Sequence, residues 1–386
     1  MKVLVLTVTA GEGHNATAAA IQKSFEERGV DCRVLDTCLQ INPALYFLIA
    51  KGYLLCASNL KKAYAYVYGK LEHREFKNLN SYVPSATRTS YKIVKKKMSQ
   101  YIEEYDPDAI VYTHVFAGAL LDVIAEKKPL RARTVGVLTD FAPHPFWEET
   151  LRSDRVVIAN ELIAPALERK GLSKDQLLPI GIPIRPQFAE SRPKEEAREA
   201  LGLDPAMPTL LLMGGSMGYG SLAKTLSDID ALDTPLQVIC VCGRNEKAKA
   251  EIDGMTFRKR VLAYGYTDQV PLLMDASDCI VSKPGGLTTS EALAKRLPMV
   301  ICNPIPGQED RNAEFLLNSG VAVKLSKHAS LSDVVYQLFC NPERIELMKK
   351  NIDLIRRPHA TRDLVDTVFA LVEEAKAEES RPLATV

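Results

Sequence analysis

The sequence lacks the features that mark a membrane-spanning or a general nucleic-acid-binding protein. Its 386 residues carry a formal net charge of only +1, which argues against general binding to nucleic acid. The most apolar stretch, 43–57, is too short to span a bilayer and is interrupted by Lys51. The apolar start Val3–Ala10 runs into Gly11–His14, which favours a buried strand and a glycine turn over a signal peptide.

Cysteine is present, but without the spacing of a metal site. The eight cysteines are scattered, and the close pair Cys240 and Cys242 lies inside an apolar run. A single Cys-x-Cys is a poor zinc site, so most of these cysteines are expected to be small buried apolar residues. This usage suits a reducing cytoplasm. The main Asp-x-Asp string, Asp228–Asp230, lies in a helical pattern, and no metal is predicted.

The sequence instead alternates short apolar runs with longer helical patterns. A 46% hydrophobic chain of this length favours two globular domains. Near-continuous apolar strands separated by helices predict an α/β fold, with two doubly wound, Rossmann-like parallel sheets covered on both faces. The runs predicted as strands are 3–9, 31–35, 109–112, 134–138, 156–159, 209–213, 237–241, 261–263, 279–281 and 299–302.

The two halves each open on a glycine turn, and prolines separate them. The prolines of Gly181–Pro186, together with Pro193, place a hinge within 181–205. A helical pattern covers 359–375, and the polar residues after it are expected to fray. The expected domains are 1–185, 186–356, and a C-terminal helix and tail over 357–386 that returns to the first domain.

A basic insert at about 44–100 interrupts the alternation. It is helical in pattern, and residues 51–100 hold 11 Lys or Arg, 2 Glu and six interleaved tyrosines. Aromatic rings beside lysines suit the headgroup level of an anionic bilayer. A solvated basic face over ordinary core tyrosines is the alternative, and the spacing alone does not decide between the two.

The first glycine turn, Gly11–Ala16, follows a strand and opens a helix. It fits G-x-G-x-x-A, and Asp36 ends the second strand where a ribose-binding acid is expected, so a dehydrogenase is one alternative. Gly13 permits the tight turn, and the helix N-terminus attracts anions. That same N-terminus disfavours an imidazolium, so His14 is predicted to be neutral and available as a base. A surface or capping histidine is the alternative.

Polar and aromatic side chains follow the fourth predicted strand. Asp140, His144 and Trp147, the one tryptophan, are expected at the carboxyl end of that strand, on the ligand side of the sheet. His114 follows another strand in the same way. Asp140 is a candidate to orient His14 or to polarise an acceptor hydroxyl. Together these residues predict a cleft.

The second glycine turn, Gly214–Gly220, lacks the Gly-Lys-Ser/Thr ending of a P-loop, so ATP hydrolysis is not implied. Its N–H groups can still bind phosphate. A second such turn counts against the dehydrogenase, in which one domain binds the dinucleotide.

The sharpest signal is Ser282–Ala294, which leaves a strand, turns on two glycines and opens a helix. The helix N-terminus supplies N–H donors for a diphosphate. Glu291 either reaches a ribose diol or closes a capping box with Thr288. Gln308 and Glu309 end the next strand and bring two polar side chains beside the same site.

These two motifs, Lys283–Ala294 and Pro304–Asn312, resemble the donor-binding signature of glycosyltransferase family 28. That family includes bacterial processive diacylglycerol glucosyltransferases, plant monogalactosyldiacylglycerol synthases and the GlcNAc transferase of the peptidoglycan lipid pathway. Gly11–Ala19 and Thr139–Trp147 resemble its diacylglycerol branch. The resemblance implies a GT-B fold, in which two Rossmann-like domains face each other across a cleft. The amino half would bind the acceptor and the carboxyl half a UDP-sugar.

Carried over by position, the resemblance also implies roles. His14 is the expected base with Asp140 beside it, His144 and Trp147 lie on the acceptor side, and the basic insert meets the membrane. The diphosphate is assigned to Gly285, Gly286, Thr288, Ser216 and Gly218, the ribose to Glu291, the sugar hydroxyls to Gln308 and Glu309, and uracil to the backbone at Gly265 and Tyr266; Gly13, Lys283 and Leu287 complete the expected donor set.

The resemblance therefore implies an inverting hexosyltransferase. A UDP-hexose is the expected donor and diacylglycerol or a related lipid the acceptor, at the inner face of the cell membrane, with no cofactor or metal. Three alternatives stay open: a transferase acting on a lipid-pyrophosphate-linked sugar, a UDP-sugar epimerase, and a binding module without catalysis. The sequence does not choose among glucose, galactose and GlcNAc.

Overall fold

The computed structural model of the chain describes residues 1–9, 12–37, 85–126, 128–144, 147, 150–214 and 222–380. The expected insert up to residue 84 and the expected phosphate-binding residues Ser216 and Gly218 lie outside these ranges. The described residues form two compact units. Unit 1 is Met1–Pro186 with His359–Val386, and unit 2 is Gln187–Pro358.

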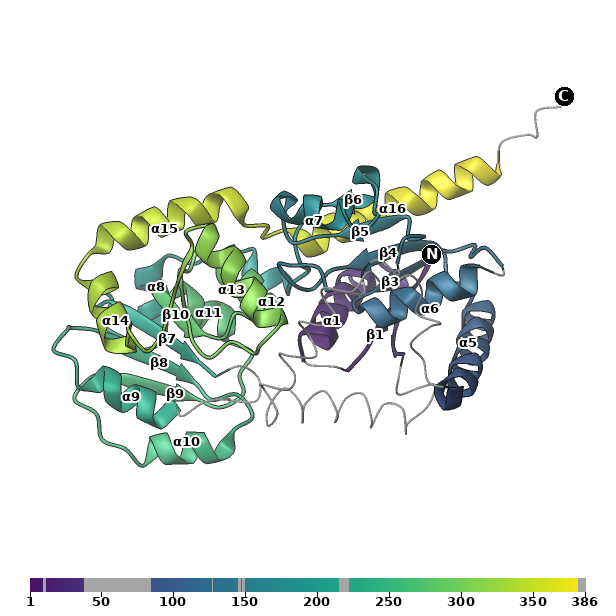
Figure 1. Ribbon diagram of the computed structural model, residues 1–386. Coiled ribbons are helices and arrows are strands. Elements are labelled where there is room, and N and C mark those ends of the chain that lie inside the picture. The colour runs from purple at the N-terminus through teal and green to yellow at the C-terminus, as the bar shows by residue number, and fades with distance from the viewer. Residues whose placement is uncertain are drawn as a thin grey trace, which may run out of the picture. The chain divides into compact units, whose positions relative to one another are not determined.

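Unit 1 is built on a parallel sheet of six described strands in the order β2-β1-β3-β4-β5-β6 (Figure 1). β2 lies on one side of β1, and the strands from β3 onward lie on the other side. The direction in which successive strands are added therefore reverses between β1 and β3. Ligands of such sheets bind beside the carboxyl ends of the strands at this switch point. The elements are β1 (Lys2–Thr7), α1 (Glu12–Glu26), β2 (Asp31–Asp36), α5 (Ser85–Tyr105), β3 (Ala109–Tyr112), α6 (Val115–Ala125), β4 (Arg133–Val137), β5 (Arg155–Val157), η4 (Glu161–Ile163), α7 (Ala164–Glu168), η5 (Lys174–Gln176), β6 (Leu177–Leu178), η6 (Pro186–Phe188, at the unit boundary) and α16 (Ala360–Glu379).

The core of unit 1 includes the last helix of the chain. β1 is buried from Val3 to Thr7 because helices cover both faces of the sheet. α16 packs on α1 and β4 (Figure 1) and adds Leu364, Val365 and Val368 to the same apolar cluster. The C-terminal helix is therefore a structural part of unit 1.

α16 is longer than the sequence pattern predicts. The tail was expected to fray from residue 375, which is wrong for its first residues, because the helix runs to Glu379. Two ion pairs are made from the last turn of the helix: Glu378 lies 2.7 Å from Arg133, and Glu379 lies 3.8 Å from Arg131. The first pair joins the helix to the first residue of β4, and the second joins it to the segment before that strand.

Unit 2 repeats the plan with the strand order β12-β11-β10-β7-β8-β9, again all parallel among the described strands. Its switch point lies between β7 and β10. The elements are α8 (Lys194–Ala200), β7 (Thr209–Met213), α9 (Leu222–Asp230), β8 (Gln237–Val241), α10 (Glu246–Asp253), β9 (Val261–Tyr264), α11 (Val270–Asp275), β10 (Cys279–Ser282), α12 (Gly286–Ala294), β11 (Met299–Ile301), α13 (Gln308–Asn318), β12 (Ala322–Lys324), α14 (Leu331–Phe339) and α15 (Pro342–Ile355).

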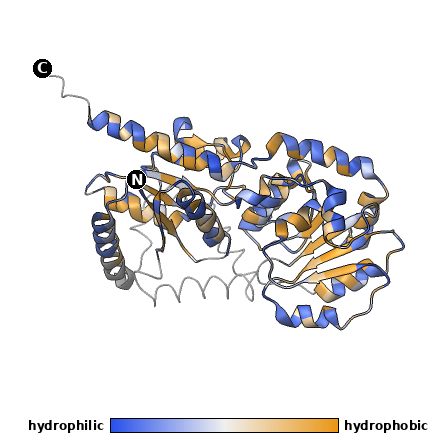
Figure 2. Ribbon diagram, turned by 180° about the vertical axis from the view of Figure 1, so that it is seen from behind, coloured by the Kyte–Doolittle hydropathy of each residue, from blue (hydrophilic) through white to orange (hydrophobic). Residues whose placement is uncertain are grey.

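Figure 2 shows that the strands are hydrophobic along their length whereas many helices have one hydrophilic face. The prediction of an α/β fold with two parallel sheets is confirmed, and every run predicted as a strand overlaps one. β6 and β12 were missed. Both are edge strands of two or three residues, too short to stand out as apolar runs. In the ranges that the structure describes, none of the helices has both the length and the apolar character needed to cross a bilayer.

Candidate active site

His14 lies at the switch point of unit 1, in the first turn of α1 just after β1. Its Nδ1 is 2.7 Å from the carbonyl oxygen of Thr113, at the end of the neighbouring β3, and 3.1 Å from the hydroxyl of Thr139 after β4. Three adjacent strands therefore bring together residues that are about a hundred positions apart in the chain. The half-buried imidazole is held at one of its two nitrogens.

The hydrogen bond to Thr113 fixes the tautomer of His14. A carbonyl oxygen only accepts, so Nδ1 carries the hydrogen and Nε2 keeps its lone pair in the neutral ring. Burial lowers the pKa of His14 below the ordinary 6.5, and the bond to the Thr113 carbonyl offsets this in part. At neutral pH the ring is uncharged, and Nε2 is a proton acceptor.

A second histidine, His114, contacts the first. The two ring centroids are 4.7 Å apart with the planes at 68°, an edge-to-face arrangement. His114 is the N-cap of α6, and its Nδ1 accepts the backbone N–H of Phe116 at 3.2 Å. Burial places the pKa of His114 well below 6.5, and the charges of His14 and His144 lower it further.

The segment after β4 carries the expected acceptor-side residues. Asp140 and His144 are half-buried, and His144 lies near enough to His114 for its charge to lower the pKa of that ring. Trp147 is only 2% exposed, and its ring stacks on Tyr112 at 6.1 Å. A Cβ on Gly136 would lie 2.4 Å from the Tyr112 hydroxyl, so this glycine makes room for the buried ring. Trp147 thus belongs to the packing beneath the site, and its acceptor role stays a prediction.

The turn between β1 and α1 is anchored from β2. The carboxylate of Asp36 accepts the Thr9 N–H at 3.0 Å and also the Thr9 hydroxyl. Asn15 continues the network through its amide, which donates to the Thr9 hydroxyl at 3.0 Å. Asp36 was the candidate ribose-binding acid of the dinucleotide alternative. Here it binds Thr9, in the segment that follows β1.

In unit 2 the expected donor motif leaves β10 at the switch point. α12 begins at Gly286 with Gly285 as its N-cap, in an extended conformation (φ −68°, ψ 141°). Thr288 and Glu291 therefore both lie within the helix, and the alternative of a capping box between them is wrong, because the capping residue of such a box precedes the helix. Glu291 is 8% exposed and Leu287 half-buried. The free N–H groups of the first turn mark an anion-binding end.

A hydrogen bond joins α13 to the turn before α12, and Glu309 of α13 lies beside that turn. The buried Asn312 amide donates to the Pro284 carbonyl at 3.0 Å. The Glu309 carboxylate accepts the Ile305 N–H at 2.6 Å, and its other oxygen would lie 3.9 Å from a Cβ on Gly285. The first turn of α13 and the glycine turn of α12 are thus in contact, as expected from their adjacent strands.

Charged side chains surround the end of β11. Burial raises the pKa of the half-buried Cys302 thiol to about 11, the Lys283 ammonium opposes this, and the Glu309 carboxylate adds to it. Lys283 and Glu309 therefore both lie near Cys302. Gln308, the first residue of α13, is half-buried. The backbone amides of the glycine turn, the Lys283 ammonium and the Glu309 carboxylate therefore lie at this edge of the sheet.

The loops after β8 and β9 lie further along the same edge. Gly265 is half-buried, and the Tyr266 ring is 69% exposed. The Arg244 guanidinium lies 5.1 Å from the centroid of that ring. The neighbouring strands β8 and β9 thus bring an arginine and an aromatic ring together.

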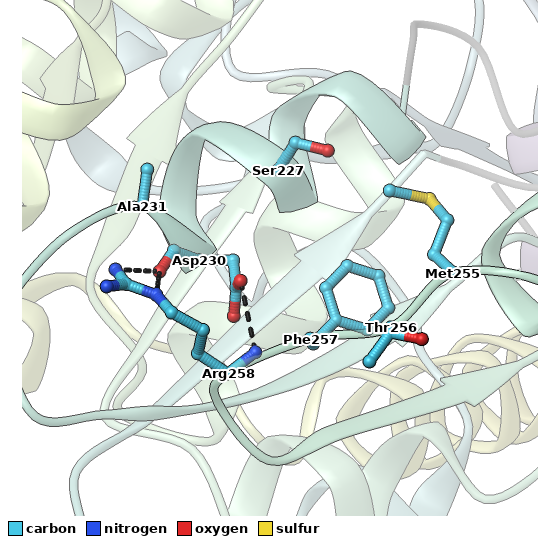
Figure 3. A pocket seen from close by; sticks show the side chains of 7 residues that line it. All are labelled: Ser227, Asp230, Ala231, Met255, Thr256, Phe257 and Arg258. Atoms are coloured by element: carbon cyan, nitrogen blue, oxygen red, sulfur yellow. Dashed lines mark hydrogen bonds between the residues drawn. The ribbon is translucent and has the colours of Figure 1, made fainter.

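A cavity of about 340 Å³ lies elsewhere on unit 2 (Figure 3). It is lined by residues at the end of α9 and before β9, so it is at the amino ends of the strands, away from the donor motif. Asp230 within it accepts the Arg258 N–H at 3.1 Å, which is a structural contact. Among the described residues, no group of three or more His, Cys, Asp or Glu is arranged to hold a metal ion.

Each unit therefore gathers its own set of predicted residues. Unit 1 brings His14 to the segment of Asp140, and unit 2 brings Lys283–Glu291 to Gln308 and Glu309. Among the contacts that were not predicted are the ring of His114 against His14 and the amide of Asn312 on Pro284. The strand order would have indicated the first, because β1 and β3 are neighbours across the switch point.

Known proteins resemble the chain over nearly its whole length. Residues 14–184 match the family described as monogalactosyldiacylglycerol (MGDG) synthase, and residues 209–366 match the glycosyltransferase family 28 C-terminal domain. Processive diacylglycerol beta-glucosyltransferase of Bacillus pumilus is 29% identical, covering 95% of this chain and 94% of its own. The enzyme of that name in Bacillus subtilis is 27% identical, covering 98% and 97%.

Solved structures show the same fold. MurG of Acinetobacter baumannii superposes with a TM-score of 0.66 at 16% identity, covering 96% of this chain and 99% of its own. The two parallel six-stranded sheets of the described residues match this GT-B structure, which confirms the predicted fold class. At such low identity the likeness speaks for the fold alone.

Proposed function

The chain belongs to glycosyltransferase family 28, and on this premise we propose that it transfers a hexose from a UDP-sugar to a diacylglycerol-type lipid. The observation that carries the proposal is the neutral His14, whose Nδ1–H is committed to the Thr113 carbonyl and whose Nε2 is a proton acceptor. A module that only binds UDP-sugar or lipid has no use for such a base. The relatives named as diacylglycerol glucosyltransferases support the same acceptor.

The donor binds at the switch point of unit 2. The diphosphate meets the N–H groups of Gly285, Gly286 and Thr288 at the start of α12, where the helix dipole favours negative charge. Glu291 binds the ribose hydroxyls, and Gln308 and Glu309 the sugar hydroxyls. This assignment is supported by the hydrogen bond that joins α13 to the turn before α12, and by the Glu309 carboxylate beside Gly285.

The transfer is a single displacement. His14 Nε2 takes the proton of the lipid hydroxyl as its oxygen forms a bond to the anomeric carbon. The bond between that carbon and the diphosphate oxygen breaks, and its electron pair leaves with UDP. The negative charge that develops on the diphosphate is stabilised by the N-terminus of α12. Attack from the face opposite UDP inverts the anomeric centre.

The acceptor is taken from a membrane surface, to which the protein binds peripherally. In the described part of the basic insert, α5 presents Lys96 and Lys97 as exposed residues while Met98 is buried. Lysines on one side of a helix favour an anionic bilayer by about 1 kcal/mol each. The match of 14–184 to the MGDG synthase family supports a lipid acceptor on the side of unit 1.

Product analysis tests this function. The protein is incubated with radiolabelled UDP-glucose, UDP-galactose or UDP-GlcNAc and vesicles that contain diacylglycerol, with and without anionic phospholipid, and the lipids are then chromatographed. We expect label from one of the three UDP-sugars to appear in a lipid product. This product should form only when the vesicles contain diacylglycerol, and its formation should be faster when they also contain anionic phospholipid. Label that enters only a lipid-pyrophosphate-linked sugar, or an epimerised UDP-sugar without any lipid product, would contradict the proposal.

A further inference from the structure

The proposed reaction assigns no role to His114, although its ring is in contact with the base. We propose that His114 is a positioning residue, which keeps His14 neutral with Nε2 as the proton acceptor by covering one side of its ring with an uncharged imidazole. The inference rests on the proposed function for its catalytic meaning. What it says about the protonation and tautomers of the two histidines does not depend on any substrate.

A single stretch of backbone holds both histidines. The carbonyl of Thr113 accepts the Nδ1–H of His14 at 2.7 Å, and the next residue along the chain is His114. The single hydrogen of the Thr113 hydroxyl lies between two acceptors, the Thr7 hydroxyl at 3.1 Å and the His14 carbonyl at 3.3 Å. The end of β3 is thereby bound to both β1 and α1, and the distance of 4.7 Å between the two rings follows from it.

The N-cap of α6 fixes the state of His114. Its Nδ1 accepts the N–H of Phe116 at 3.2 Å, so the neutral ring carries its hydrogen on Nε2. An imidazolium would need a hydrogen on Nδ1 as well, and the capping bond would be lost. Burial and the nearby histidines His14 and His144 oppose that charge too. His114 is therefore a ring that stays neutral while His14 takes up a proton.

The effect on His14 is one of solvation. The titratable groups at this end of the sheet are His114, whose ring contacts His14, His144, whose charge acts on His114, and Asp36, which is bound to Thr9. Asp140 follows Thr139, whose hydroxyl lies 3.1 Å from His14 Nδ1. An uncharged ring against His14 takes the place of water that would stabilise its imidazolium. Without that ring, water reaches His14, and the base becomes protonated at a higher pH.

Two substitutions test the two roles of His114 separately: its ring against His14, and its Nδ1 as the N-cap of α6. Asparagine is a good N-cap residue, so His114→Asn keeps an acceptor for the Phe116 N–H and removes the ring. His114→Phe keeps a ring and removes the acceptor. His328→Asn, an exposed histidine of unit 2, is the matched control. For each full-length protein, NMR of 15N-labelled histidine follows His14 against pH without substrate, with its signals assigned by His14→Gln.

We expect wild-type His14 to be a neutral Nδ1–H ring at pH 7. In His114→Asn, His14 should gain its second proton at a higher pH than in wild type. The value of kcat/KM at pH 6.0 should then be about 5-fold lower than in wild type, whereas at pH 8.5 it should stay within about 2-fold of wild type. His114→Phe should titrate like wild type with a lower Tm, and the control should change nothing.

An unchanged His14 titration in His114→Asn would overturn the inference, as would a His114→Phe protein that titrates like His114→Asn. A wild-type spectrum with the hydrogen of His14 on Nε2 would overturn it without any variant. Because these readouts need no substrate, they stand even if no glycolipid forms, which would instead contradict the proposed function.

Discussion

At the scale of single residues, two histidines from distant parts of the chain meet at the carboxyl edge of the unit 1 sheet. His14 donates from Nδ1 to the Thr113 carbonyl, and His114 accepts at Nδ1 from the Phe116 N–H. Their neutral forms are therefore opposite tautomers, with a lone pair on Nε2 of His14 and a hydrogen on Nε2 of His114. Of these two rings, His14 is therefore the one whose Nε2 lone pair is able to take up a proton.

Replacement of His14 tests its role. His14→Ala should lower kcat by about 100-fold or more, because it removes the general base, while the Kd for UDP should change by less than about 2-fold. Steady-state kinetics and calorimetry of UDP binding measure the two effects. His328→Ala, at an exposed site of unit 2, is the control. A variant with unchanged turnover would remove His14 as the base.

The pH profile of the wild-type protein follows from the direction of the pKa shift. Burial lowers the pKa of His14 below 6.5, and the base works only in its neutral form, which predominates above its pKa. The acid-side midpoint of kcat/KM against pH should therefore lie below 6.5. A midpoint at or above pH 6.5 would show that His14 is solvated like an ordinary histidine.

At this scale the sequence predicted part of the arrangement. A helix N-terminus after a strand indicated that His14 is neutral, and the lowered pKa agrees, with burial as its main cause. The tautomer was not predictable, because the partner of Nδ1 is a backbone carbonyl 99 residues away. Nor does spacing indicate the contact with His114, which depends on the order of the strands.

At the scale of elements, the proposed donor site is a pair of helices that leave neighbouring strands. α12 follows β10 and α13 follows β11, and the Asn312 amide joins them at the Pro284 carbonyl. The glycine turn was recognisable in the sequence because it joins an apolar strand to a helix. The true N-cap, Gly285, was not, since Thr288 and Glu291 have the spacing of a capping box.

Asn312→Ala should loosen this pair of helices. The substitution leaves the Pro284 carbonyl without a buried donor, which should cost about 1–3 kcal/mol of unfolding free energy. The KM for UDP-sugar should rise as the glycine turn loses its support. Asn318→Ala, at an exposed position in the same helix, should change neither quantity. An Asn312→Ala protein with wild-type stability and KM would contradict the proposed support.

At the scale of the whole molecule, the chain returns to unit 1 for its last helix. Leu364, Val365 and Val368 of α16 share a core with residues of β1 and α1, and the Thr361 hydroxyl donates to the Ile184 carbonyl. The alternation of apolar runs and helices predicted both sheets. It could not predict how far α16 extends, because its last turn is polar and is bound through ion pairs with Arg133 and Arg131.

Leu364→Ala should show that α16 is part of the fold of unit 1. Leu364 is fully buried, and its truncation should lower the unfolding free energy by about 2–5 kcal/mol, from lost burial and the cavity left behind. Glu374→Ala, at an exposed position of the same helix, should stay within about 0.5 kcal/mol of wild type. Urea unfolding measures both. Equal effects of the two substitutions would contradict the packing of α16.

The central claim is a one-step transfer of a hexose from UDP to the hydroxyl of diacylglycerol. The most direct test is the configuration of the anomeric carbon in the first glycolipid formed, determined by NMR of the purified product. UDP-hexoses carry their sugar in the α configuration, so attack from the opposite face predicts a β-linked sugar. An α-linked product, or no lipid product from any UDP-hexose, would contradict the account.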